Sequence, residues 1–242
     1  MKKTGTYFVA FGVLSFVFMI LCTMCLFIDY ESTSNALPVS LLQKRNVIVI
    51  DPGHGGEDGG CVSDNGILEK DLNLIIANKL RYILSASGYD VRMTRQDDKM
   101  VYDMYDDLSD YKGKKKLFDL KNRIKFAKEN SADMFVSIHM NKFPISKYKG
   151  LQVYYSPNND GSESIARLVK ENNHLYLQKD NERNIKSAGT NIFILNRLEI
   201  PAVLIECGFL SNAEEAELLC DEVYRNKLAL VIATSLIKYN AG

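Results

Sequence analysis

The sequence predicts an α/β fold, with a twisted and mostly parallel sheet of six strands and helices on both faces. Short segments rich in β-branched residues alternate along the chain with longer segments whose apolar residues recur at helical spacing. Several of the short segments are apolar throughout, as expected of parallel strands that are covered on both faces. Together these observations favour one α/β domain.

The first two expected strands flank a long helix. NVIVI (Asn46–Ile50) is a continuous β-branched run, and a glycine-rich loop follows it. The apolar residues of the next helix recur at helical spacing until Gly88, and they are Leu72, Ile75, Ile76, Leu80, Ile83 and Leu84. YDVRMTR (Tyr89–Arg95) is expected to form the second strand.

The same alternation continues to the end of the chain. Further strands are expected at Ala132–His139, Gly150–Ser156, Asn191–Leu195 (NIFIL) and Pro201–Glu206. Helices are expected at Leu117–Asn130, near Glu163–Asn173 and at Asp221–Tyr239. No linker or internal repeat interrupts this stretch, so residues 46–242 are predicted to be a single catalytic-size domain.

Residues 1–29 are predicted to form a membrane anchor or signal segment, and residues 30–45 a linker. The almost unbroken apolar run Tyr7–Ile28 is long enough for a transmembrane helix, which needs about 20 residues. The basic pair Lys2 and Lys3 precedes it, which places the following domain outside the cytoplasm. An uncleaved anchor is favoured, and a cleaved signal that releases a secreted domain is the alternative.

Charge and cysteine content exclude several classes of function. Thirty basic and thirty acidic residues cancel, so no overall field attracts nucleic acid. Outside the apolar leader, the three cysteines show no C-x-x-C spacing. We therefore expect neither a disulfide framework nor a cysteine-rich zinc site.

Three expected strands end on residues capable of chemistry. His54 follows the first strand, His139 closes the third, and Glu206 closes the strand PAVLIE. If these strands are parallel, the three side chains meet at one edge of the sheet, where open α/β sheets bind ligands. Glu69, at the start of the helix after the glycine loop, completes a two-histidine, one-glutamate zinc set, with Glu206 left as a base.

Simpler interpretations apply to each residue alone. Glu69 is also a favourable charge at a helix N-terminus, and His174 lies among polar residues and is expected on the surface. The glycine loop lacks the Gly-Lys-Ser/Thr of a phosphate-binding loop, and Asp58 stands at the third glycine position of a dinucleotide fingerprint. A dinucleotide site would leave His139 and Glu206 without a role.

The segments IDPGHGGEDGG, LEKDLNL, GYDVRMTR, FVSIHMN, GLQVYYS and PAVLIECGFLSN, in this order, resemble the zinc-dependent N-acetylmuramoyl-L-alanine amidases. This resemblance implies one zinc ion held by His54, Glu69 and His139, with Glu206 as the catalytic glutamate. It also implies peptidoglycan as the substrate, cleaved between the lactyl group of N-acetylmuramic acid and L-alanine. An anchor followed by a bare catalytic domain is similar to the spore-cortex amidases of endospore formers, which act outside the cytoplasm, including the forespore intermembrane space.

Two other functions stay open at the level of sequence. One is a non-catalytic peptidoglycan-binding module on an amidase scaffold, and the other is a cell-wall hydrolase with Cys61 or Cys207 as nucleophile. The polar stretch 99–116 is longer than the usual family connection. We interpret it as a solvated loop, or else as a lid or the surface for an accessory or activating protein.

Overall fold

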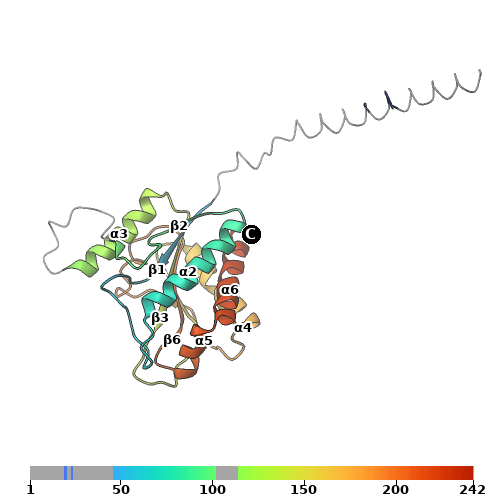
Figure 1. The fold of residues 1–242 in the computed structure, drawn as a ribbon. Helices are drawn as coiled ribbons and strands as arrows, with labels where there is room; N and C mark the ends of the chain where they lie inside the picture. Colours follow the sequence, from blue (N-terminus) through green and yellow to red (C-terminus); the bar gives the residue numbers. More distant parts are fainter. Residues whose placement is uncertain (1–18, 21–22, 24–45, 102–113, 242) are drawn as a thin grey trace, which may run out of the picture. The chain divides into compact units, whose positions relative to one another are not determined.

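The computed structural model describes residues 19–20, 23, 46–101 and 114–241 (Figure 1). The chain divides into two compact units, residues 1–44 and 45–242. Most of the expected anchor and linker lies outside the described residues. Among the residues that are described, no helix is both long and apolar enough to cross a membrane.

The larger unit is built on one six-stranded sheet, as the sequence predicts. The strands are β1 (Val47–Pro52), β2 (Asp90–Met93), β3 (Met134–Asn141), β4 (Gln152–Tyr155), β5 (Lys186–Ser187) and β6 (Ala202–Phe209). They are arranged in the order β2-β1-β3-β6-β4-β5. Only β4 and β6 pair antiparallel, and every other neighbouring pair is parallel, so the sheet is mostly parallel.

Helices cover both faces of the sheet (Figure 1). One face packs against α2 (Glu69–Ala86), α4 (Asp160–Tyr176) and α6 (Glu222–Ala241), and α2 and α4 each contact α6. On the other face, α3 (Lys115–Glu129) and the turns at residues 192–198 enclose a smaller apolar cluster. A short helix that the sequence analysis did not anticipate, α5 (Ala213–Cys220), precedes α6.

The segment NIFIL is not a strand, and this prediction was wrong. Its residues form turns, and the strand beside β4 is the two-residue β5. The carbonyl oxygen of Leu195 accepts hydrogen bonds from the side chains of Ser156 and Asn158. Ile194 and Leu195 are buried against the smaller cluster, so the apolar run packs as turns, with side chains bonding its backbone.

The strand ends relevant to function lie on one edge of the sheet. β1, β3 and β6 are parallel neighbours, which confirms the arrangement expected for them. Their carboxyl ends therefore meet at the same edge, and the N-terminus of α2 follows the loop that leaves β1. This edge is where open parallel sheets place their ligand sites.

Candidate metal centre and active site

His54 stands in the loop after β1, in a backbone conformation that residues other than glycine rarely adopt. Its φ angle is 60°, within the left-handed region. Its neighbour Gly53 has no space for a side chain, because a Cβ atom there would lie 2.1 Å from Cε1 of His139. The loop thus brings the two imidazole rings together, with their centroids 5.0 Å apart.

Three side chains from three elements meet here. Ligand atoms of His54, Glu69 and His139 all lie within 4.8 Å of one another. Oε1 of Glu69 is 3.1 Å from Nε2 of His54 and 2.9 Å from Nδ1 of His139. Because Glu69 is the first residue of α2, the helix N-terminus delivers a carboxylate to the ends of β1 and β3.

The main chain holds the Glu69 carboxylate in place. The residue is only 3% exposed. The backbone N–H of Cys61 donates to Oε2 at 2.8 Å, and that of Met140 donates to Oε1 at 3.1 Å. Gly60 passes so close that a Cβ atom there would lie 2.5 Å from Oε2. These contacts fix the orientation of the carboxylate before any ligand binds.

Opposite charges perturb the titration of this cluster. Burial alone would lower the pKa of His54, but the carboxylates of Asp58 and Glu69 raise it to about 9. Burial would raise the pKa of Glu69, but His139 and His54 hold it well below its usual range. Oδ2 of Asp58 lies 2.9 Å from Nδ1 of His54, so its negative charge stands at the ring nitrogen that Glu69 does not contact.

Glu206 lies beside the cluster with an unsatisfied carboxylate. Its Cα is the register partner of the Cα of His139, so both side chains point to the same face of the sheet. Oε2 of Glu206 is buried and has no hydrogen-bond partner among the described residues. Burial raises the pKa of Glu206 to about 7, which suits a group that exchanges a proton near neutral pH.

The donor set fits a zinc ion. Two imidazoles and a carboxylate are a common ligand set of catalytic zinc, whose fourth position stays open to water or substrate. A carboxylate such as Asp58, bound to the second nitrogen of His54, is a frequent partner of metal-binding histidines. The buried Oε2 of Glu206, which accepts no hydrogen bond from any residue that the structure describes, also fits a site completed by a non-protein group.

Two buried arginines hold the loop that carries His54, and the sequence analysis singled out neither. Arg95 donates from Nε to the carbonyl of Pro52 and from Nη2 to that of Gly53, both at 3.0 Å. Arg123 of α3 donates to the carbonyls of Pro52 and His54, at 2.9 and 2.8 Å. Three successive carbonyl groups are thus bound by cations, which stabilises the turn behind the candidate metal centre.

The family comparison agrees with this site. The family model for N-acetylmuramoyl-L-alanine amidase matches residues 48–238. The chain belongs to this amidase family. The resemblance noted in the sequence is therefore confirmed, and it extends over nearly all of the larger unit.

Several members of the amidase family are similar over most of their length. The germination-specific N-acetylmuramoyl-L-alanine amidase of Bacillus subtilis (strain 168) is 32% identical over 227 residues, 93% of each chain. The CwlD amidase from Clostridioides difficile, solved in complex with the GerS lipoprotein, is 38% identical with a TM-score of 0.76. That match covers 81% of this chain and 99% of the other. An N-acetylmuramoyl-L-alanine amidase from Clostridium difficile 630 is 33% identical, with a TM-score of 0.69 and coverage of 83% and 99%.

Three further residues, Asp51, Asn141 and His174, lie around this site or away from it. Asp51 is fully buried and binds Arg123, so it acts on the loop and not directly on a ligand. Asn141 lines a small cavity beyond β3. His174 is exposed near the end of α4, as expected.

The thiols lack the features of a nucleophile. Burial raises the pKa of Cys61, and Glu69 raises it further. Burial likewise raises the pKa of Cys207, which is 0% exposed. A reactive cysteine needs a lowered pKa and access to substrate, so the environment of both residues disfavours a cysteine hydrolase.

Both described ends of the stretch 99–116 contact the glycine loop, and residues 102–113 lie outside the described residues. On one side, the backbone passes so close to the loop that a Cβ atom at Gly55 would lie 2.3 Å from the carbonyl oxygen of Lys99. On the other, Lys115 pairs with Glu57 at 2.9 Å and Lys116 with Asp58 at 3.6 Å. The stretch therefore begins and ends against the loop that carries His54.

Proposed function

We propose that this chain is a zinc-dependent hydrolase that cleaves the amide between the lactyl group of N-acetylmuramic acid and L-alanine in peptidoglycan. The observation that carries the proposal is the convergence of His54, Glu69 and His139 beside the unpaired carboxylate of Glu206. Membership of the amidase family supports the substrate and the bond cleaved.

The proposed roles follow from position and charge. His54, Glu69 and His139 hold one zinc ion, and Asp58 orients His54. In such a site zinc supplies Lewis-acid polarisation of a carbonyl group and activation of water. Glu206 accepts the proton of the attacking water and returns it to the leaving amine, because burial keeps its pKa near neutrality.

We propose a role at the spore cortex, where the cut is the first step toward muramic-δ-lactam and germination. Two similar proteins support this role: one is named a germination-specific amidase, and another is a CwlD amidase. The apolar run in residues 1–29 supports an anchor with the catalytic domain, residues 46–242, outside the cytoplasm.

An accessory protein is part of the proposal. The related CwlD amidase was solved with the GerS lipoprotein. We place the contact surface for such a partner at residues 99–116, because the described ends of this stretch lie against the loop that carries His54. A partner bound there would act on the metal centre through that loop.

Mass spectrometry of digested peptidoglycan tests the reaction. The full-length chain in detergent should release stem peptides with a free L-alanine amino group in the presence of zinc. A chelator should abolish release, whereas a thiol reagent should not. Inactivation by the thiol reagent alone would favour the cysteine hydrolase. Binding of peptidoglycan without release under any condition would favour the non-catalytic binding module.

Metal analysis tests the ligand assignment separately from turnover. The purified chain should contain one zinc per molecule. His139→Ala should lose most of it, while His174→Ala, which changes an exposed histidine of α4, should keep it. Full zinc content in both variants would refute the assignment.

A further inference from the structure

A small cavity lies beside β4, the strand that pairs with β6 at Glu206. Its volume is about 230 Å³, and aromatic and amide side chains line it together with two cations, Arg183 and Lys186. No carboxylate is among the lining residues that the structure describes. The cavity is therefore a basic and aromatic hollow.

The strand register places this cavity next to Glu206. Gln152 of β4 is the register partner of Glu206, and Tyr154 lies two residues further along the same strand. Side chains two residues apart share a face, so Tyr154 and its register partner in β5, Lys186, lie on the face that bears Glu206. Neighbouring strands are about 4.8 Å apart, which puts the cavity roughly 5–10 Å from Glu206.

Hydrogen bonds and a ring contact fix the side chain of Arg183 at this cavity. Its Nε donates to the carbonyl of Lys149 at 2.8 Å, and its backbone N–H donates to Oδ1 of Asn181 at 3.0 Å. The guanidinium lies 4.4 Å from the centre of the Phe209 ring. Neither terminal nitrogen has a hydrogen-bond partner within the described part of the chain, so both stay available for a ligand.

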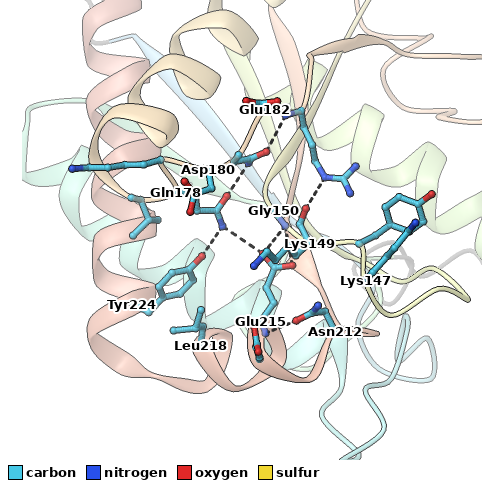
Figure 2. A pocket seen from close by; sticks show the side chains of 16 residues that line it. Lys147, Lys149, Gly150, Gln178, Asp180, Glu182, Asn212, Glu215, Leu218 and Tyr224 are labelled. Carbon is cyan, nitrogen blue, oxygen red and sulfur yellow. Dashed lines mark hydrogen bonds between the residues drawn. The ribbon is translucent and has the colours of Figure 1, made fainter.

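The segment before Arg183 is fixed by a polar network around a larger cavity of about 660 Å³ (Figure 2). Nε2 of Gln178 donates to the hydroxyl of Tyr224 at 2.7 Å, and Nδ2 of Asn181 donates to Oε1 of Gln178 at 2.9 Å. Oε1 of Glu215 accepts from the backbone N–H of Gly150 at 2.8 Å. In Figure 2 the side chains of Gln178, Tyr224 and Glu215 point toward one another near Gly150. This network anchors the loop that carries Arg183.

We propose that the smaller cavity binds the leaving side of the substrate, with Arg183 paired to a carboxylate of the stem peptide. This inference rests on the proposed amidase function. The acyl side of the scissile amide is a neutral sugar, whereas the amine side is an acidic peptide. A positively charged cavity therefore favours binding of the peptide side over the sugar side. A guanidinium with two free terminal nitrogens matches a carboxylate, which it binds through two parallel hydrogen bonds.

The reach of the peptide agrees with this placement. Each residue spans at most about 3.3–3.6 Å, so the acidic residue after L-alanine brings its carboxylate roughly 7 Å from the scissile nitrogen. This is within the interval that the strand spacing gives between Glu206 and the cavity. Lys186 supplies a second, more exposed positive charge at the same hollow.

Two matched substrates test the proposal. The zinc-loaded, full-length chain is given N-acetylmuramoyl-L-alanyl-D-glutamate or the D-isoglutamine analogue, in which an amide replaces the α-carboxylate, and in both substrates the γ-carboxyl group is capped as an N-methylamide. The wild type should prefer the acid in kcat/KM by about 10- to 100-fold, the worth of a charge-assisted hydrogen-bonded pair. Arg183→Gln should lose this preference, with little change for the amide, and Arg183→Lys should recover part of it.

Arg197→Gln is the matched control, because Arg197 also stacks on a phenylalanine, at 5.1 Å from the Phe193 ring, but lines neither cavity. It should keep the wild-type preference. An equal fall for both substrates in Arg183→Gln, or a wild type that does not discriminate, would overturn the role of Arg183 while leaving the amidase function intact.

Calorimetric binding of the free dipeptides, L-alanyl-D-glutamate and L-alanyl-D-isoglutamine with the same γ-cap, separates the two proposals. Selective binding of the acid that is lost in Arg183→Gln, without hydrolysis of either muramoyl substrate, would overturn the amidase function and support the carboxylate site. Hydrolysis of the muramoyl substrates with equal binding of both dipeptides would support the amidase function and overturn the carboxylate site.

Discussion

Arg123 of α3 and Asp51 of β1 form an ion pair in the interior of the protein, with Nη1 and Oδ1 2.6 Å apart. Their side chains are 2% and 0% exposed. The same guanidinium donates to the carbonyl of His54 at 2.8 Å. The pair therefore joins α3 to the loop that carries a proposed metal ligand, and stability and metal binding should depend on it together.

Arg123→Met should destabilise the protein strongly. The change leaves the carboxylate of Asp51 buried without its cation, which typically costs about 3–5 kcal/mol, and it should also weaken zinc binding by releasing the His54 loop. Urea unfolding and zinc titration measure the two effects. Arg167→Met, which breaks an exposed pair with Glu163 in α4, should cost less than about 1 kcal/mol. Equal losses in both variants would contradict a special role for Arg123.

Asp51 should make the free energy of unfolding depend on pH in the acidic range. Burial alone would raise its pKa, but Arg123, Thr94 and Ser137 hold it below the ordinary value of 3.8. A carboxyl group with a lowered folded-state pKa stabilises the fold above its unfolded pKa, and this contribution is lost as the pH falls toward the folded-state pKa.

The stability difference between wild type and Asp51→Asn should therefore be constant above about pH 5. Below the unfolded pKa it should shrink by up to about 1.4 kcal/mol per pH unit. Urea unfolding of both proteins at pH 7, 5, 4 and 3 measures the difference. A difference that stays constant or widens down to pH 3 would show that the folded-state pKa of Asp51 is not lowered.

Gly53→Ala should damage the metal centre through a single methyl group. The added Cβ would meet the His139 ring at 2.1 Å, so the imidazole must move and zinc affinity should fall at least about tenfold, as when the surroundings of a metal ligand are disturbed. Gly59→Ala lies in the same loop and places its Cβ 3.5 Å from Leu68, an ordinary contact, so it should bind zinc normally. Similar zinc affinities in the two variants would count against the geometry described for His139.

The two glutamates should respond differently to the same substitution. Glu206→Gln keeps shape but cannot accept a proton, so zinc and peptidoglycan should bind while turnover falls by roughly 10²–10⁴-fold. Glu69→Gln removes a charged ligand, so zinc binding should weaken and added zinc should restore part of the activity. Turnover at rising zinc concentration, measured beside metal content, separates them. Rescue of Glu206→Gln alone would mean that the roles are reversed.

Protease protection tests the expected anchor and its orientation. Protease added to intact protoplasts should degrade the catalytic domain, because Lys2 and Lys3 precede the apolar run and keep the N-terminus in the cytoplasm. Survival of the domain until lysis would refute this orientation. A free domain in the medium that starts near Leu37 would identify the apolar run as a cleaved signal.

The sequence by itself determined the alternation of strands and helices and the chemistry at three strand ends. Apolar β-branched runs and helical periodicity are local patterns, and each reports the burial of its own segment. The same local patterns predicted Glu69 at the start of a helix, and it is the first residue of α2 in the structure. It also placed His174 on the surface.

Only the tertiary structure decided which segments pair and what supports the site. NIFIL has the composition of a strand, but Ser156 and Asn158 bond the carbonyl of Leu195, and no local pattern records such a distant donor. Arg123 lies 69 residues from the carbonyl of His54 that it binds, and Arg183 lies 34 residues from that of Lys149. In the sequence each is one basic residue among thirty. The low polarity around the buried Arg123 and the contacts that orient Arg183 exist only once distant segments have packed together.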